Sequence, residues 1–202
     1  MNTNQAFEIL SRASDPHSAR IICEHMPKMS VFKVHRIAFQ LRKNTPVAKI
    51  IHEKWFYGLP FYTNSHTLDP RPDTETLVES VLSDKPQNVK ILDIGTGTGC
   101  IIAALMKHIP ESTGVAIDKS YSALKVAKQN IRNLNLNKYI QIKHADFSKP
   151  KSINEKFDII VSNPPYISHN DSRVDAYAKH DPKMALYAKH DGLYAYEQIA
   201  QN

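Results

Sequence analysis

The run Asn163-Pro164-Pro165-Tyr166 combines side chains and carbonyl groups that could hold a planar NH2 group. It follows the apolar, β-branched residues 157–161, a pattern typical of a strand that is buried on both faces in a parallel sheet. Neither proline can donate to a sheet ladder and both fix φ, so they end the strand and hold Asn163 on a stiff backbone. The carboxyl ends of such strands are where open α/β sheets bind ligands. The alternative interpretation is a strand that ends in an ordinary turn.

A glycine-rich loop provides a second candidate site. Residues 89–94 predict a strand, residues 100–106 predict an apolar helix, and between them lies Gly95-Thr96-Gly97-Thr98-Gly99. The chain has 6 glycines, and this loop holds three of them. A strand, a glycine turn and a helix allow the backbone to approach a nucleotide-like ligand closely. Cys100 stands where a dinucleotide-binding fingerprint would need glycine, and a tight turn without a ligand is the alternative.

Two acidic residues follow the next two predicted strands. Asp118 ends the strand-like residues 113–118, at about the distance downstream where an acid can accept hydrogen bonds from both hydroxyls of a ribose. Asp146 and Phe147 follow the strand-like residues 139–145, where the acid could accept from an adenine amino group and the ring could pack on the base. Each acid on its own is more often a helix N-cap or a solvated loop residue. Successive strands that each end at a suitable group predict an adenosylmethionine site.

Longer stretches of sequence make the pattern more specific. Residues 55–61 read Trp-Phe-Tyr-Gly-Leu-Pro-Phe, and residues 68–75 read Leu-Asp-Pro-Arg-Pro-Asp-Thr-Glu. Residues 181–186 and 191–193 read Asp-Pro-Lys-Met-Ala-Leu and Asp-Gly-Leu. Together with the Asn-Pro-Pro-Tyr run, which nucleic-acid amino-methyltransferases share, these stretches resemble the protein-(glutamine-N5) methyltransferases that modify peptide chain release factors. Asp69 stands where that family is expected to carry an apolar residue, so we expect looser packing at this point of the chain.

The resemblance implies a class I methyltransferase that uses S-adenosylmethionine to methylate the side-chain amide nitrogen of a glutamine in a release-factor loop. The implied catalytic residues are Asn163, Pro164 and Tyr166, and the substrate-binding residues are these three with Pro165. The implied cofactor-binding residues are Asp93, Gly95, Thr96, Gly97, Thr98, Gly99, Asp118, Asp146, Phe147 and Asn163. No metal and no direct contact with nucleic acid are expected. The alternative is an amino-methyltransferase that acts on adenine or cytosine in nucleic acid. Such an enzyme needs a pocket for a flipped base and a recognition region, and the sequence shows no pattern typical of either.

The pattern along the chain predicts three parts. Residues 1–52 predict a small helical domain that the resemblance assigns to substrate recognition, with Asp15-Pro16 and Ser30 as helix starts. The second helix is expected from Val31 to Arg42, and Pro46 is expected to end the helical body. Within that helix Val31, Val34, Ala38 and Leu41 form an apolar stripe expected to face a core. Residues 53–73 predict a hairpin or linker, and residues 74–202 predict the methyltransferase domain.

Composition agrees with this interpretation without deciding it. The net charge is +6, which suits an acidic or ribosome-associated partner, although the lysines are scattered over the chain. The 2 cysteines are far apart, and the 10 histidines show no spacing suited to a metal site, so a reduced cytoplasmic location is expected. No apolar stretch is long enough to cross a membrane.

The last part of the sequence predicts an incomplete sheet. Strands are expected at 89–94, 113–118, 139–145 and 157–163, and a helix near Gly192. The fold class expected is therefore α/β: a Rossmann-like, adenosylmethionine-dependent methyltransferase sheet that lacks its C-terminal strands, beside a small N-terminal helical domain. From this we expect the front part of a longer enzyme, with a non-catalytic remnant as the other interpretation.

Overall fold

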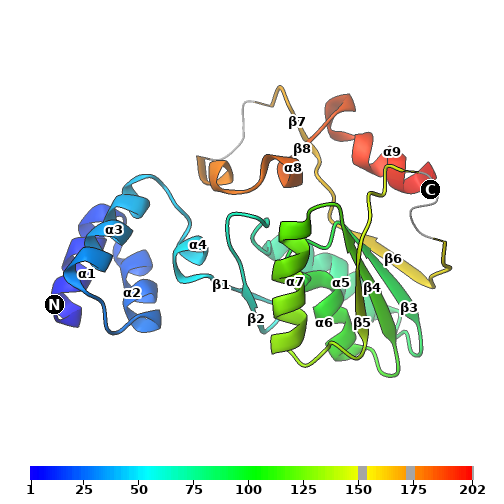
Figure 1. The fold of residues 1–202 in the computed structure, drawn as a ribbon, viewed down its shortest axis with the longest axis horizontal. Helices are drawn as coiled ribbons and strands as arrows, with labels where there is room; N and C mark the ends of the chain where they lie inside the picture. The colour runs from blue at the N-terminus through cyan, green and yellow to red at the C-terminus, as the bar shows by residue number, and fades with distance from the viewer. Residues whose placement is uncertain (150–153, 172–175, 202) are drawn as a thin grey trace. The chain divides into compact units, whose positions relative to one another are not determined.

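The computed structural model describes residues 1–149, 154–171 and 176–201. These residues divide into two compact units. One consists of residues 1–53 and the short helix η2 (Ala176–His180), and the other contains the remaining described residues. The stretch 53–73, predicted as a linker, thus lies almost entirely in the second unit. Figure 1 labels the elements in chain order.

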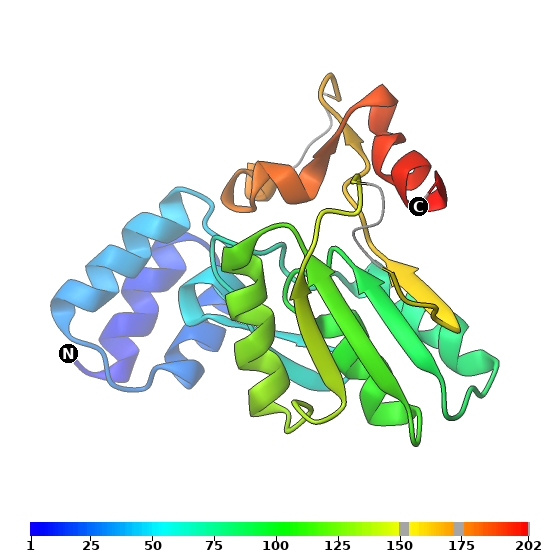
Figure 2. The ribbon, with the colours of Figure 1, turned by 45° about the vertical axis from the view of Figure 1, so that its right-hand side comes forward.

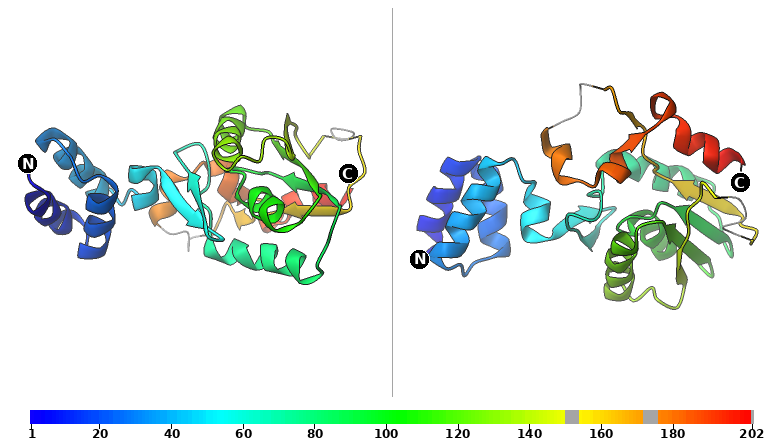
Figure 3. Two further views of the ribbon diagram at one scale, coloured as in Figure 1. Left: turned by 90° about the horizontal axis from the view of Figure 1, so that it is seen from below. Right: turned by 45° about the horizontal axis from the view of Figure 1, so that its top comes forward.

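The first unit is a helical body built from α1 (Thr3–Ala13), α2 (Pro16–His25), α3 (Val31–Arg42) and α4 (Val47–Ile51). The predicted helix starts are confirmed: Asp15 accepts a hydrogen bond from the Ser18 N–H and Ser30 from the Lys33 N–H. Helices α1, α2 and α3 pack side by side (Figure 3) around a core that includes Leu10, Ile22, Val34, Ile37 and Leu41.

Two predictions for this unit are wrong. The predicted helix from Val31 to Arg42 is confirmed as α3, but Pro46 does not end the helical body. Pro46 is the N-cap of α4, which still belongs to this unit, and that position suits its fixed φ and missing N–H. Val31 is 53% exposed, although Val34, Ala38 and Leu41 on the same predicted stripe are buried. Val31 is the first residue of α3, where the helix has not yet reached the core.

A short hairpin opens the second unit, as predicted. It pairs β1 (Glu53–Phe56) with β2 (Leu59–Tyr62) through the turn residues Tyr57 and Gly58, whose φ angles are 48° and 70°. Positive φ at both central residues matches the right-handed twist of the strands. Phe56 and Phe61 are fully buried and meet edge to face at 6.2 Å, which joins the hairpin to the main core. The chain then passes through η1 (Pro72–Thr74) into α5 (Glu75–Ser83).

The main sheet is parallel, with the order β5-β4-β3-β6 in the described residues. Its strands are β3 (Lys90–Ile94), β4 (Thr113–Asp118), β5 (Ile140–His144) and β6 (Ile159–Ser162), in line with the predicted series (Figure 2). Asp93 of β3 is paired with Ala116 of β4 and Val161 of β6, so the carboxyl ends of the three strands lie together. This order places β3 and β6 next to each other, and with them the glycine loop and the Asn-Pro-Pro-Tyr run.

Helices cover the two faces of this sheet unequally. Helices α5, α6 (Cys100–His108) and α7 (Tyr121–Asn133) form a layer on one face, where Ile91, Ala116 and Val161 pack into the main core. The other face carries a smaller cluster around Leu92, Ile94, Val115 and Ile117, to which α9 (Tyr194–Gln201) contributes Ile199.

The prediction that residues 157–161 are buried on both faces is wrong. Ile160 is paired with Leu92, which faces the smaller cluster, and its side chain is 57% exposed. Val161, on the helix-covered face, is buried. The strand composition therefore indicated β6 correctly, but burial depends on which elements cover each face.

Short elements follow the Asn-Pro-Pro-Tyr run. β7 (Ile167–Ser168) pairs in parallel with β8 (Tyr187–Ala188), and α8 (Lys183–Leu186) and η3 (His190–Gly192) lead into α9, the helix expected near Gly192. Gly192 has a φ of 95°, and a Cβ atom there would lie 2.2 Å from the carbonyl oxygen of Tyr166. Only glycine allows this close approach, which holds the end of the Asn-Pro-Pro-Tyr run against η3.

Candidate active site

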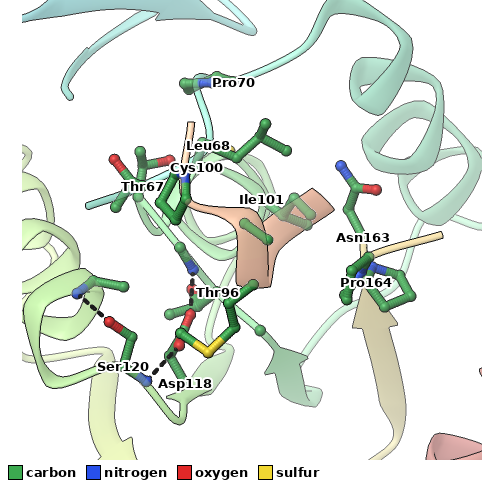
Figure 4. Close-up of a pocket in the computed structure, with 18 of the residues that line it drawn as sticks. Thr67, Leu68, Pro70, Thr96, Cys100, Ile101, Asp118, Ser120, Asn163 and Pro164 are labelled. Carbon is green, nitrogen blue, oxygen red and sulfur yellow. Dashed lines mark hydrogen bonds between the residues drawn. The ribbon is translucent and has the colours of Figure 1, made fainter. Parts of the chain in front are cut away.

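A cavity of about 120 Å³ opens at the carboxyl ends of β3, β4 and β6. The glycine loop, Asp118 and the Asn-Pro-Pro segment line it, together with residues 66–71 before α5 and residues from the start of α8. Figure 4 shows Asn163 and Pro164 on one side of the cavity and Asp118 and Ser120 on the other. The sheet topology thus brings together groups that lie more than 60 residues apart in the sequence.

The glycine loop takes a conformation that only glycine adopts easily. Gly95, Gly97 and Gly99 have φ angles of 71°, 55° and 80°. A Cβ atom at Gly95 would meet nothing within 4 Å, and one at Gly97 would meet only the Gly95 carbonyl oxygen at 3.9 Å. Both glycines line the cavity, so the space that their side chains would fill is open for a ligand.

Asp93, on β3, holds the glycine loop through a side-chain hydrogen bond. Its side chain is fully buried, and Oδ2 accepts a hydrogen bond of 2.6 Å from the Thr96 hydroxyl. Burial raises the pKa of Asp93 to about 7, against the opposing effect of the Thr96 hydrogen bond. The Thr96 N–H in turn donates to the Ile117 carbonyl at 2.9 Å, so the loop is tied to both β3 and β4. Asp93 does not itself appear on the cavity wall within the described residues.

Asp118 joins the loop to the start of α7. Its carboxylate accepts from the Gly97 N–H at 3.0 Å and from the Ser120 N–H at 2.8 Å, one on each oxygen. Burial raises the pKa of Asp118, and these two backbone hydrogen bonds lower it. Each carboxylate oxygen can accept more than one hydrogen bond, so Asp118 can still accept from a ligand hydroxyl.

Asp146 and Phe147 lie toward one end of the site. Asp146 accepts from the N–H and the hydroxyl of Ser148 and faces an adjoining cavity of about 300 Å³. Burial raises the pKa of Asp146, but the Ser148 hydrogen bonds outweigh it and the net shift is downward. Phe147 lines both cavities, as do Lys119 and Pro165.

The Asn-Pro-Pro-Tyr run contributes its first three residues to the cavity wall. Asn163, Pro164 and Pro165 line the cavity, and the Asn163 Nδ2 atom donates a hydrogen bond of 3.0 Å to the Thr74 hydroxyl oxygen. The Tyr166 side chain is 59% exposed and is not part of the wall formed by the described residues. Its catalytic role therefore stays a prediction.

Gly99 has a packing role in the structure. A Cβ atom at this position would lie 3.4 Å from the Cβ of Ala127 on α7, and Gly99 lies outside the cavity wall that the described chain forms. It allows the start of α6 to pack closely on α7. The other four residues of the loop, Gly95, Thr96, Gly97 and Thr98, all line the cavity.

Asn130 was not predicted from the sequence as a site residue, but its side chain holds the glycine loop. Its side chain is buried on α7, donates to the carbonyl oxygens of Thr98 and Tyr62 at 2.9 Å each, and accepts from the Tyr62 N–H at 2.7 Å. The available signal was a single amide on the otherwise apolar buried stripe of α7. Asn130 thus fastens the hairpin, the glycine loop and α7 to one another.

The Arg-Pro-Asp-Thr-Glu stretch, residues 71–75, connects several segments around the site. Arg71 pairs with the buried carboxylate of Asp181 at 2.7 Å, and Glu75 accepts from the Tyr57 N–H at 2.7 Å. Thr74, between them, accepts from Asn163. Three of its polar side chains therefore contact three different segments: the residues before α8, the hairpin and the end of β6.

The expectation of loose packing at Asp69 is wrong. Asp69 is buried, and its Oδ1 atom accepts a hydrogen bond of 2.6 Å from the Thr63 hydroxyl, which lies 3.3 Å from the hydroxyl of Thr67. A carboxylate that accepts a hydrogen bond can replace an apolar side chain without loosening the chain. Asp69 and Thr67 both line the cavity.

Several other features do not contribute to the site. No group of three His, Cys, Asp or Glu residues suited to a metal occurs in the part of the chain that the structure describes. Cys100 lines the cavity, but burial raises the pKa of its thiol to about 12, so it is not a nucleophile at neutral pH. Among the described residues, no helix is long and apolar enough to cross a membrane.

Known proteins are similar to this chain in sequence and in fold. A release factor glutamine methyltransferase of Streptococcus pneumoniae is 42% identical over 173 residues, covering 84% of this chain and 60% of that protein. One of Flavobacterium psychrophilum is 38% identical over 174 residues, covering 82% and 60%. The chain thus spans about 60% of the length of these curated relatives. They confirm the resemblance stated from the sequence motifs.

Solved structures support the fold. The hMettl16 catalytic domain, solved in complex with an RNA hairpin, aligns with a TM-score of 0.53 and 20% identity, over 72% of this chain and 56% of that one. At this identity the likeness concerns the fold alone, and it confirms the predicted Rossmann-like methyltransferase sheet. Residues 66–181 match the family described as MTS, Methyltransferase small domain, so the chain belongs to that methyltransferase family.

Proposed function

We propose that this chain binds S-adenosylmethionine and transfers its methyl group to the side-chain amide nitrogen of a glutamine in peptide chain release factors. One observation carries the proposal: Asn163 and Pro164 share a cavity with the glycine loop and Asp118. Asn163 and Pro164 can hold an amide NH2 group, and the glycine loop and Asp118 can hold a nucleoside with a charged tail. A methyl donor and an amide acceptor can therefore meet in one cavity.

The residues present fit the donor. The positions of Gly95 and Gly97 are open to the cavity where side chains would otherwise lie, and their backbone can approach the donor closely. Asp118 keeps acceptor capacity for ribose hydroxyls beyond its two backbone hydrogen bonds. Phe147 offers a ring beside the cavity for an aromatic base. When bound, S-adenosylmethionine supplies a methyl group that its sulfonium makes electrophilic.

The acceptor needs help because an amide nitrogen is a poor nucleophile, its lone pair being delocalised into the carbonyl group. Hydrogen bonds from the NH2 group to the Asn163 side-chain oxygen and the Pro164 carbonyl oxygen would hold the nitrogen in line with the methyl group. Positioning of this kind can lower a barrier by up to about 7–11 kcal/mol.

The same two acceptors stabilise the transition state. An amide nitrogen that takes up the methyl group supplied by the donor would become positively charged. Asn163 and Pro164 oxygens, aimed at the N–H groups, stabilise that charge as it develops. The acidified nitrogen then loses a proton to water, so no strong general base is required.

The partner and the location are also part of the proposal. The relatives of S. pneumoniae and F. psychrophilum are named for release factors, and the chain's net charge of +6 suits an acidic or ribosome-bound partner. The helical unit of residues 1–53 would help to hold the release factor, and the protein would act in the cytoplasm. Tyr166 would pack against the bound glutamine segment.

A transfer assay tests the proposal. The purified chain is incubated with methyl-labelled S-adenosylmethionine and one of three additions: a release factor, adenine-containing DNA, or no acceptor. We expect label in the release factor alone, lost when its target glutamine is replaced and lost again in the Asn163→Ala variant. Label in the DNA would favour the nucleic-acid alternative. Donor binding without transfer to any acceptor would favour a binding remnant.

A further inference from the structure

The Asn163 side chain can present either of two chemically opposite ends. Its carboxamide has an acceptor oxygen and a donor NH2 group of nearly equal size, and a half-turn about the last torsion exchanges them. A substrate NH2 group can bind only to the oxygen. A site that uses Asn163 to hold an amide nitrogen therefore needs something that fixes which end faces the cavity.

The backbone of Asn163 is already fixed by its neighbours. The Ser162 hydroxyl donates a hydrogen bond of 2.8 Å to the Ile94 carbonyl oxygen, which ties the end of β6 to β3. The ring of Pro164 fixes the φ angle of Pro164, the residue directly after Asn163. These contacts hold the main chain but leave the orientation of the carboxamide free. The Asn163 carboxamide is oriented by a hydrogen bond from its Nδ2 atom to the Thr74 hydroxyl oxygen.

Thr74 is itself held in place from both sides. It is buried at the end of η1, its N–H donates to the Arg71 carbonyl oxygen at 3.0 Å, and it lines the cavity. Arg71 is anchored to Asp181, and Glu75 is anchored to the Tyr57 N–H. The hydroxyl of Thr74 therefore has little freedom to follow Asn163 if the amide rotates.

From this geometry we propose that Thr74 is a positioning residue that sets the polarity of Asn163. By accepting a hydrogen bond from Nδ2, Thr74 turns the Asn163 oxygen toward the acceptor. The inference rests on the proposed function and deepens it: Thr74 selects an acceptor that carries two N–H donors, such as a carboxamide. It excludes a carboxylate, which would place two acceptor oxygens against the Asn163 oxygen and leave the site's buried acceptors unpaired.

Matched variants separate the hydroxyl from the rest of the side chain. Thr74→Val keeps the shape and removes the hydroxyl, whereas Thr74→Ser keeps the hydroxyl and removes the methyl group. Thr76→Val is the control: Thr76 is exposed two residues further along α5, and its hydroxyl donates to the Asp73 carbonyl oxygen outside the cavity. All three are compared with the wild type in kcat and KM for a release factor, in donor Kd, and in Tm.

We expect Thr74→Val to lower kcat by about tenfold or more, because a freed amide samples the wrong orientation and the acceptor loses alignment. Its donor Kd should stay within about twofold of the wild-type value, since the hydroxyl contacts Asn163 and not the glycine loop. Thr74→Ser should restore most of the turnover, and Thr76→Val should match the wild type. Equal loss in Thr74→Ser and Thr74→Val would overturn the proposal, because the methyl group and not the hydroxyl would then matter. Unchanged kcat in Thr74→Val would also overturn it.

A second readout does not depend on catalysis. The side-chain NH2 group of Asn163 gives a pair of ¹H–¹⁵N resonances that are assigned by their absence in Asn163→Ala. We expect them to be well separated in the wild type and in Thr74→Ser, and to shift toward the values of free carboxamides in Thr74→Val. If this pattern appears but no acceptor is methylated, the positioning by Thr74 stands and the proposed function fails. If the Asn163 NH2 resonances have the same chemical shifts in Thr74→Val as in the wild type, the positioning role is refuted, even when the enzyme is active.

Discussion

The buried carboxyl group of Asp93 makes the stability of the fold depend on pH in a definite direction. Its pKa is raised from 3.8 to about 7 because burial disfavours the charged form. Between these two values the folded state binds a proton that the unfolded state has released. Stability therefore falls as the pH rises through this window, and is flat above the folded pKa.

The magnitude follows from the shift. A difference of about three pKa units corresponds to about 4 kcal/mol in total, of which about 2–3 kcal/mol is lost between pH 5 and pH 8. Asp93→Asn removes the titration and keeps an oxygen that can accept from Thr96. The free energy of unfolding of the variant should therefore depend less steeply on pH than that of the wild type, whatever the absolute cost of the substitution.

Urea unfolding at pH 5, 6, 7 and 8 measures this difference. Other groups, such as Asp118, titrate in both proteins, so subtracting the variant curve from the wild-type curve isolates Asp93. The wild type should lose about 2–3 kcal/mol relative to the variant between pH 5 and pH 8. A difference that stays constant with pH would refute the reasoning, because it would mean that Asp93 is ionised in the fold throughout this range.

Three further predictions concern the glycine loop and its supports. Asp118→Ala should weaken donor binding by about 1.5–3 kcal/mol for each charge-assisted hydrogen bond lost, measured by calorimetry; unchanged affinity would remove Asp118 from the donor site. Gly97→Val should abolish donor binding, because the new side chain enters the cavity and the φ of 55° at this position strains the loop; circular dichroism should stay near that of the wild type because the side chain does not enter the core. Binding that persists would mean that the loop is only a turn. Asn130→Leu should lower the free energy of unfolding by about 2–4 kcal/mol, since it removes three hydrogen bonds that join α7 to the hairpin and the glycine loop; a Tm equal to that of the wild type would contradict this bracing role.

Features set by local sequence could be predicted. The strands β3, β4 and β5 follow from runs of apolar residues, the caps at Asp15 and Ser30 from short polar side chains before apolar helices, and the glycine turn from three glycines in five residues. Their physical causes act within a few residues of each other. For this reason, predictions of this kind agreed with the structure even where no distant contact was known.

Contacts between distant segments could not be predicted in the same way. The Thr74–Asn163 hydrogen bond spans 89 residues, the Arg71–Asp181 ion pair spans 110 and the Asn130–Tyr62 pair spans 68. Their existence depends on which segments the fold brings together. The wrong prediction of burial at Ile160 has the same origin, because exposure there is decided by the elements that cover the sheet face and not by the strand itself.

These long-range contacts support the two sides of the cavity separately. On the proposed donor side, hydrogen bonds with Asp93 of β3, Asp118 of β4 and Asn130 of α7 hold the glycine loop. On the acceptor side, Thr74 holds Asn163, and its hydrogen bond does not involve the glycine loop. Changes to residues on one side should therefore leave the other intact: donor affinity should follow Asp118 and Gly97, and the Asn163 amide resonances should follow Thr74. If Thr74→Val changed donor affinity as strongly as Asp118→Ala, the two sides would be mechanically coupled, and methyl transfer would depend on one network rather than two.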